Sequence, residues 1–328
     1  MNGNHLTIVM YHYVRDLKNS RYPTIKGCDI RDFKEQLDFL GRHYNFVTME
    51  EVIAAYREGA SLPPHPVLLT FDDAYKDHFE YVFPLLDHRH IQGCFFPPVK
   101  AVTEHTVLDV NKIHFILAST PEDRFDTLLG EIRLQMDRNR EEFSLEPFEH
   151  YYEKLAKPSR FDRAEVIFVK RLLQVELDES LRHRIADSIF EKVVGIDEDA
   201  FSRELYMSVG QIRCMVGCGM HVGSHGYDHY WLSSLPRERQ EFEIGKSIGF
   251  IRDVGGDPEN WTMCYPFGDY NDATIGLLRE RGCRLGLTTR VDLADLDDRS
   301  PDAVFKLPRL DVNDLPKKAD AIVNDWYR

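Results

Sequence analysis

The chain has 328 residues, of which 43% are hydrophobic and 29% are charged, so it can bury a sizeable core. Its formal net charge of -14 argues against a nucleic-acid partner, which needs a basic face, and against adhesion to an anionic membrane. Met1–His5 lack a basic region and no long apolar run exists, so we expect neither a secretory signal nor a transmembrane helix. Free cysteines in apolar contexts favour a reducing cytoplasm.

The first hundred residues alternate between strand and helix patterns. An apolar strand is predicted from Leu6 to Tyr11 and ends at His12. Helices are predicted over residues 28–44 and 48–57, the second opened by a capping box at Thr48. Such alternation indicates a mainly parallel sheet with helices outside it.

The next strand, over residues 67–71, stops at two adjacent carboxylates, Asp72 and Asp73. Ligands and chemistry lie at the carboxyl ends of strands in α/β sheets. Adjacent side chains diverge there, so one carboxylate can hold a metal ion while the other handles a proton. The alternative is a helix cap and turn. A helix over 76–88 and a strand over 93–96 follow.

Residues 101–205 carry helical patterns only. Apolar positions recur at helical spacing over 122–136, 163–175 and 179–194. We therefore expect a helical insertion within an α/β domain formed by residues 1–100 and 206–328. The insertion could serve packing and homo-oligomer contact, or it could cover the substrate as a lid.

The α/β pattern resumes with a capping box at Ser208. A short strand over 220–223 precedes His225 and His229, which are four residues apart. Two imidazoles and one carboxylate are a sufficient ligand set for a catalytic divalent metal with an open position for water. A His-x3-His loop can also be incidental, but two such motifs at strand ends in one chain favour the metal site.

The remaining pattern is strand over 261–265, helix over 272–281, strand over 285–288 and a closing segment over 307–312. Helix is also predicted from Pro236 to Val254, where Pro opens the first turn. Counting the whole chain gives about seven strands.

Three stretches resemble the motifs of the NodB-homology polysaccharide deacetylases, carbohydrate esterase family 4. They are Leu69–Tyr75 (LTFDDAY), Gly223–His229 (GSHGYDH) and Tyr265–Gly268 (YPFG). The resemblance covers roughly residues 5–100 and 205–315. It implies a deformed (β/α) barrel of about seven strands, here with a large helical insertion.

The resemblance also implies roles for the motif residues. Asp73, His225 and His229 match the metal ligands, and Asp72 matches the catalytic base. An alternative in which both carboxylates are ligands stays open. The resemblance favours Zn2+ as the metal, with Co2+ or Ni2+ as alternatives.

The chain departs from the family at the expected general acid. Amide hydrolysis needs an acid to protonate the leaving nitrogen. Many members supply a histidine from a C-terminal motif, but Leu307–Asp314 contains none. Met10–Val14 (MYHYV) resembles the N-terminal signature of a subgroup in which the acid comes from the first strand. We therefore expect His12 to be the acid, the alternative being a histidine packed at the strand mouth.

Further departures concern the residues around the base. Cys264 stands where the third motif often has an Arg that pairs with the base. Arg309 could supply that charge and lower the pKa of Asp72, or it could form an ordinary surface ion pair. Ala74 replaces a usual Gly, which is tolerable unless the backbone needs a positive φ. The backbone N–H of Phe267 matches the position that stabilises the oxyanion.

Together these features predict a metal-dependent amidohydrolase that removes an N-acetyl group from an amino sugar and releases acetate. A nucleotide- or lipid-linked precursor of a surface glycan is the expected substrate, inferred from the missing signal. One alternative is a deformylase or another deacylase with the same residues. Others are a catalytically impaired sugar-binding module and an assembly partner in a glycan-synthesis complex.

Overall fold

The computed structural model describes residues 4–327; the expectation about the N-terminal segment falls partly on residues 1–3, outside that range. The chain divides into two compact units. The first comprises Met1–Lys18, Gly27–Thr106 and Ser202–Arg328, and the second comprises Asn19–Lys26 and Val107–Phe201. Over the described range, no helix combines the length and apolarity needed to span a membrane.

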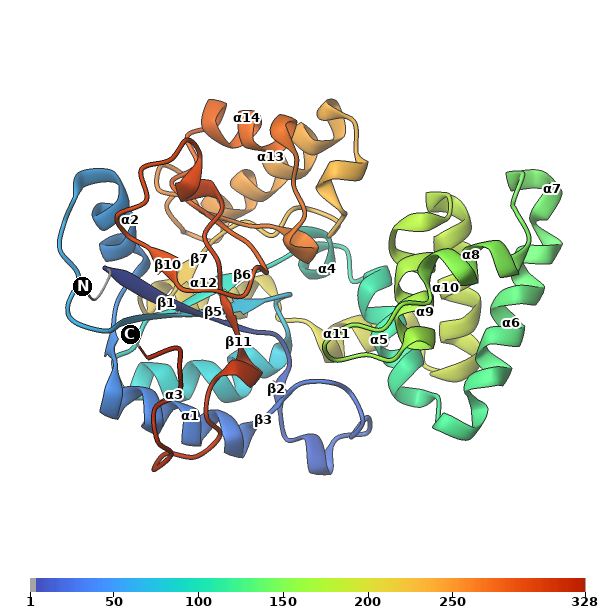
Figure 1. Ribbon diagram of the computed structural model, residues 1–328, viewed down its shortest axis with the longest axis horizontal. Helices are drawn as coiled ribbons and strands as arrows, with labels where there is room; N and C mark the ends of the chain where they lie inside the picture. The colour runs from blue at the N-terminus through green and yellow to red at the C-terminus, as the bar shows by residue number, and fades with distance from the viewer. Residues whose placement is uncertain (1–3, 328) are drawn as a thin grey trace. The chain divides into compact units, whose positions relative to one another are not determined.

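The first unit is built on a mainly parallel sheet (Figure 1). Neighbouring strands of this sheet pair in parallel, except that β10 runs antiparallel to β1. The strands are β1 (His5–Tyr11), β4 (Asn45–Phe46), β5 (Pro66–Asp72), β6 (Gly93–Phe96), β7 (His221–Val222), β10 (Ala294–Asp295) and β11 (Leu310–Asp311). Two further parallel pairs are β2 (Val14–Arg15) with β3 (Cys28–Asp29), and β8 (Met263–Cys264) with β9 (Gly286–Leu287).

Isolated bridges continue the pairing round the far side of the sheet. Ser224 pairs with Met263, which links β7 to β8, and Leu287 pairs with Leu307, which links β9 to the segment leading into β11. Because β11 pairs with β1, the strands form a ring. Its far side is made of two-residue strands and single bridges, so the barrel is deformed. The expected fold class is confirmed.

Helices lie outside the strands of this unit (Figure 1). The capping boxes expected at Thr48 and Ser208 are both formed. The helices are α1 (Ile30–His43), α2 (Met49–Glu58), the π-helix η2 (His78–Val82), α3 (Phe83–His88), α4 (Val99–Thr103), α12 (Val209–Gly217), α13 (Arg237–Asp253) and α14 (Asp272–Glu280). Short 3-10 turns are η1 (Leu17–Asn19), η5 (Leu232–Ser234), η6 (Pro266–Gly268), η7 (Ala303–Phe305) and η8 (Val312–Asp314).

One predicted helix begins later than expected. The helix placed over 28–44 starts at Ile30, because Cys28 and Asp29 pair with β2 and the Asp29 carboxylate caps the helix by accepting from the Arg31 N–H. This pairing has no signal in the apolar spacing. The helix placed over 76–88 does begin at Lys76, directly after the turn with positive φ at Asp73 and Ala74, and it becomes a π-helix from His78.

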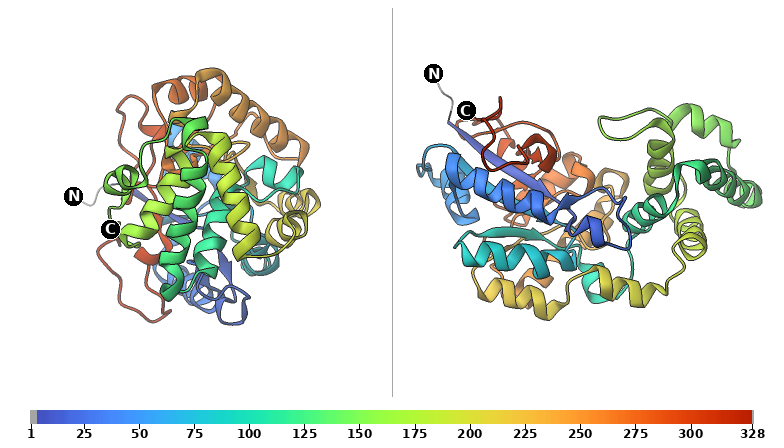
Figure 2. Two further views of the ribbon diagram at one scale, coloured as in Figure 1. Left: turned by 90° about the vertical axis from the view of Figure 1, so that its right-hand side faces the viewer. Right: turned by 90° about the horizontal axis from the view of Figure 1, so that it is seen from below.

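The second unit is helical (Figure 2). The helices of the second unit are α5 (Asp109–Ser119), η3 (Glu122–Arg124), α6 (Phe125–Arg138), α7 (Arg140–Phe143), α8 (Phe148–Leu155), α9 (Ala164–Arg171), the π-helix η4 (Leu172–Glu176), α10 (Glu179–Val193) and the start of α11 (Glu198–Leu205). Helix α10 packs against α5 and α6.

The boundaries of this unit differ from the predicted insertion, 101–205. Helix α4 and residues 202–205 belong to the first unit, and residues 19–26 join the second. That segment packs through the Tyr22 ring, whose centroid lies 4.9 Å from Phe115 and 6.0 Å from Phe201. These long-range contacts could not be seen in a local sequence pattern.

The barrel strands divide their side chains between two buried clusters. Leu6 and Ile8 of β1 join a cluster that includes Leu68 and Phe96, whereas Val9 and Tyr11 join the cluster that contains α1. The period of two follows from the pleat of a strand. All seven residues of β5 are buried, as expected for a strand covered on both faces. Asp72 shares the face of Leu68 and therefore lies at the end of the barrel interior.

Candidate active site

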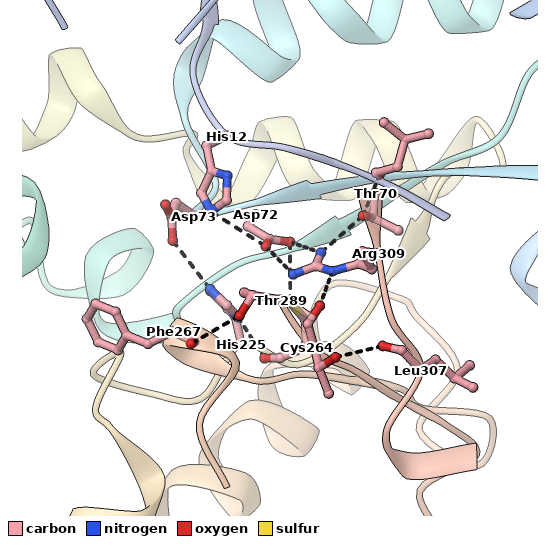
Figure 3. A network of polar contacts seen from close by, with 12 residues as sticks. His12, Thr70, Asp72, Asp73, His225, Cys264, Phe267, Thr289, Leu307 and Arg309 are labelled. Atoms are coloured by element: carbon pink, nitrogen blue, oxygen red, sulfur yellow. Dashed lines mark hydrogen bonds and ion pairs between the residues drawn. The ribbon is translucent and has the colours of Figure 1, made fainter. Parts of the chain in front are cut away.

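The strand register brings the predicted site residues to one edge of the barrel. Tyr11 of β1 pairs with Phe71 of β5, so His12 and Asp72 leave neighbouring strands at the same level. Phe96 of β6 pairs with Asp72. Figure 3 shows His12, Asp72, Asp73 and His225 converging, although their segments are far apart in sequence.

Asp73, His225 and His229 form a buried cluster. Asp73 Oδ1 lies 3.4 Å from His225 Nε2 and 3.3 Å from His229 Nε2. Their candidate ligand atoms all lie within 4.8 Å of one another. The carboxylate's other oxygen, Oδ2, accepts a hydrogen bond of 2.7 Å from the Tyr75 hydroxyl. Only Oδ1 is therefore turned toward the two imidazoles.

This cluster fits a divalent metal ion. His225 Nδ1 lies 2.7 Å from the carbonyl oxygen of Cys264, which can only accept, so Nδ1 carries a hydrogen and Nε2 is the nitrogen that faces Asp73. Asp73 Oδ1 is buried and has no hydrogen-bond partner among the described residues. Neighbouring ligands of a tetrahedral zinc ion lie about 3.3 Å apart for bonds of about 2.0–2.1 Å. The two measured separations match that spacing.

Arg309 binds the Asp72 carboxylate, which also lies within 4.8 Å of the ligand atoms of His225 and Cys264, a second group that could hold a metal ion. Nη1 and Nη2 of Arg309 donate to the two carboxylate oxygens of Asp72 at 3.0 and 2.8 Å. Arg309 is 0% exposed, and its guanidinium also donates to Thr288 O and Thr70 Oγ1. The alternative of a surface ion pair is therefore wrong. With both Asp72 oxygens engaged, the geometry favours Asp73 as the carboxylate ligand.

The environment of Asp72 keeps its carboxylate ionised. Burial raises the pKa, but the charge of Arg309, with smaller contributions from His225 and His12, outweighs it and lowers the pKa to about 2. A carboxylate that is ionised at neutral pH can accept a proton. Cys264 Sγ donates to Asp72 Oδ1 at 3.4 Å, and burial raises the pKa of this thiol, so it stays protonated. The guanidinium expected at position 264 is thus supplied by Arg309, in the segment just before β11.

His12 lies at the mouth of the site. Its Nε2 is 3.8 Å from Asp72 Oδ2, and its side chain is 40% exposed. The ring is thus close to the reacting region and open to solvent. Its role as the acid remains a prediction.

The turn after Asp72 and the turn after β8 have unusual backbone angles. Ala74 has a φ of 56°, so the backbone at this position does take the positive φ that disfavours a side-chain methyl group. A non-glycine residue in this left-handed conformation costs roughly 1–2 kcal/mol. Phe267 has a φ of 58°. Its ring lies 4.6 Å from His229 and stacks on Trp231 at 4.7 Å. Its ring therefore lies beside the cluster, and the role of its backbone N–H as oxyanion donor remains a prediction.

Sequence reasoning missed the groups that hold the loop between the two histidines. Oε2 of the buried Glu243 accepts from the N–H groups of Tyr227 and Asp228 at 2.7 and 2.9 Å. Lys100 donates from its backbone to Tyr227 O at 2.9 Å and from Nζ to Asp228 at 2.5 Å. The only available signal was a polar residue on the apolar face of a helix, since Glu243 shares a buried stripe with Gln240 and Ser247.

The comparisons with known proteins agree with this site. Residues 200–286, which contain both histidines, match the family model described as polysaccharide deacetylase. No curated protein sequence matches the chain at a significant level.

Solved structures share the fold across 94% of this chain. A Streptococcus pyogenes deacetylase, PplD, in complex with acetate has 15% identity and a TM-score of 0.56 over 93% of its own chain. The deacetylase domain of BpsB from Bordetella bronchiseptica has 17% identity and a TM-score of 0.54 over 96% of its chain. IcaB from Ammonifex degensii has 20% identity and a TM-score of 0.50 over 91% of its chain. The family match over residues 200–286 confirms the resemblance seen in the sequence motifs, and the solved structures show the same fold.

Proposed function

We propose that the chain is a metal-dependent N-deacetylase of an amino sugar, which the match of residues 200–286 to the polysaccharide deacetylase model supports. The observation that carries this proposal is the buried Asp73, His225 and His229 cluster beside the ionised Asp72. Two nitrogens and one oxygen suit Zn2+, with Co2+ or Ni2+ as alternatives.

The cluster and the residues beside it have different roles in the proposed hydrolysis. A divalent cation held by Asp73, His225 and His229 would supply a Lewis acid that polarises the acetyl carbonyl and lowers the pKa of a water molecule to about 7. Asp72 takes the proton of the attacking water as a general base. Arg309 keeps Asp72 ionised and fixes its orientation by a two-point contact.

The remaining two groups act on the substrate. The backbone N–H of Phe267 donates to the oxygen that develops negative charge during attack on the carbonyl. His12 gives a proton to the leaving nitrogen, because an amide anion is too poor a leaving group. The products are acetate and the free amine of the sugar. One structure of the same fold was solved in complex with acetate, which supports this product.

The proposed substrate is an acetylated amino sugar within a glycan or a nucleotide- or lipid-linked glycan precursor. The choice of a precursor rests on the expected cytoplasmic placement, which remains a prediction. A homo-oligomer formed through the helical unit is likewise still a prediction.

The test is release of acetate from a panel of free, nucleotide-linked, lipid-linked and oligomeric N-acetyl sugars. The protein is supplied with Zn2+, Co2+ or Ni2+ in turn. We expect release that stops after chelation and in Asp72→Asn, a variant that keeps the three proposed ligands. Release of formate or another acid would favour the deacylase alternative. Sugar binding without any release would favour the binding module.

A further inference from the structure

The backbone of His12 is held more firmly than its ring. The 3.8 Å separation between His12 Nε2 and Asp72 is too long for a direct hydrogen bond, so that contact does not fix the residue. In contrast, His78 Nε2 lies 2.7 Å from the carbonyl oxygen of His12. A carbonyl only accepts, so His78 Nε2 carries the hydrogen and donates it.

His78 is well placed for this one contact. It is 0% exposed, and its ring centroid lies 5.5 Å from Phe71, 5.6 Å from Tyr75 and 5.9 Å from Phe95. Burial lowers the pKa of His78 to about 4, so the ring is neutral at physiological pH. A buried polar group is costly unless it is hydrogen-bonded; the His12 carbonyl satisfies Nε2, whereas Nδ1 has no partner among the described residues. His78 also begins the π-helix η2, and such turns occur frequently at functional sites.

Neighbouring contacts tie the same two segments together. Arg15 Nε donates to the carboxylate of Asp77 at 2.7 Å. The rings of Tyr13 and Tyr75 stack with their centroids 3.9 Å apart. Because Tyr75 also donates to Asp73, the segment that follows β5 holds both a metal-ligand candidate and the backbone of His12.

We propose that His78 is a positioning residue for His12. Its hydrogen bond to the His12 carbonyl fixes the backbone from which the imidazole projects toward the leaving nitrogen. This inference rests on the proposed function, which makes His12 the general acid. In this proposal His78 does not contact the substrate and acts only through His12.

The test compares two leaving groups in the full-length, metal-loaded protein. One substrate is an N-acetyl sugar from the panel above, and the other is 4-nitrophenyl acetate. The amide needs an acid to protonate its nitrogen, whereas nitrophenolate leaves without protonation. A lesion confined to the acid therefore slows the amide and spares the ester. A general structural lesion slows both.

The variants are His78→Leu, which removes the donor, and His78→Asn, which keeps a side-chain N–H. We expect His78→Leu to lower kcat on the amide by roughly 10- to 100-fold, since a small displacement of a reacting group is that costly. Ester hydrolysis and metal content should stay within about 3-fold of wild type, and His78→Asn should recover most of the amide rate. His12→Ala should show the same selectivity with a larger loss.

Three outcomes would contradict the inference. Equal losses on both substrates would give His78 a merely structural role. An unchanged amide rate in His78→Leu, with the wild type active, would overturn the inference alone. A wild type that loads metal but releases no acetate from any sugar would overturn the proposed function, and the positioning role with it.

Discussion

The most constrained side-chain pair of the candidate site is Asp72 with Arg309. Both are buried, and the guanidinium has protein partners on three sides: Asp72, Thr70 and Thr288. Burying two charges is costly, and their attraction offsets this cost only when geometry and additional hydrogen bonds are good. The arrangement is therefore better explained by orientation of the base than by stability.

Removing Arg309 should expose the cost of burying Asp72. We expect Arg309→Met to lower the free energy of unfolding by about 3–5 kcal/mol, because an unpaired buried carboxylate remains. The pKa of Asp72 should rise, since burial is then unopposed. Urea unfolding measures the first effect.

The matched control is Arg31→Met. Arg31 also pairs with an aspartate, Asp29, but its side chain is 69% exposed. An exposed pair contributes about 0–1 kcal/mol. If both variants lost the same small amount, the buried pair would not have the role assigned to it.

Single residues show where sequence reasoning stops. The carboxylates and histidines of the site could be predicted from their residue types and their spacing at strand ends. Arg309 was found because a charge was missing at Cys264. The roles of His78 and Glu243 could not be predicted, because their partners are backbone atoms 66 and about 15 positions away in sequence.

At the scale of elements, the loop over residues 226–228 depends on two helices. Glu243 of α13 accepts its N–H groups, while Val99 and Lys100 at the start of α4 donate to its carbonyls. This loop sets the separation of His225 and His229. Groups that orient metal ligands commonly change affinity by 10- to 100-fold when they are lost.

Two substitutions of Glu243 should therefore distinguish its role as a hydrogen-bond acceptor from the role of its negative charge. Glu243→Gln keeps an oxygen that accepts both N–H groups, so metal affinity should stay within a few-fold of wild type. Glu243→Leu leaves two backbone donors without their acceptor and should weaken metal binding by roughly 10- to 100-fold. Competition with a chromogenic chelator measures both. Equal affinities in the two variants would show that the loop holds its shape without Glu243.

The same residue should make stability depend on pH. Burial raises the pKa of Glu243 to about 7, above its usual 4.5, so the folded state favours the neutral form. Its contribution is present in full below about pH 4.5 and declines as pH rises through 7. Glu243→Gln, which cannot ionise, should match wild type at pH 4.5 and be more stable at pH 8 by up to about 3 kcal/mol. A constant difference across this range would contradict the assignment.

Element prediction succeeded where local signals suffice. Both capping boxes and the run into Asp72 follow from residue type and period. The pairs β2–β3 and β8–β9 involve strands of two residues, too short to show a period. The π-helix η2 was read as an ordinary helix, because apolar spacing does not distinguish the two.

At the scale of the whole molecule, the seven site residues named from the sequence all belong to the first unit. The second unit has a buried lysine that pairs with two exposed carboxylates. Lys112 is 5% exposed and pairs with Asp187 and with Glu198, the latter at 2.9 Å. Composition and helical periods predicted a helical insertion, but the inclusion of residues 19–26 depends on contacts across the fold.

Changing Lys112 should affect stability without affecting the metal site. We expect Lys112→Met to destabilise the protein by about 1 kcal/mol or less, because it removes two ion pairs whose carboxylates are exposed and stay hydrated. Metal content per chain should be unchanged, because the candidate ligands lie in the other unit. Thermal unfolding and metal analysis on one preparation check both. Loss of metal in a folded Lys112→Met would contradict this division of roles.

The most direct test of the account is the metal content of the purified protein beside Asp73→Ala and His225→Ala. We predict close to one divalent ion per wild-type chain and its loss in both variants, with Lys112→Met as the control that retains it. Absence of metal from wild type after loading, or equal metal in all variants, would contradict the proposed ligand set and remove the physical basis of the hydrolase mechanism.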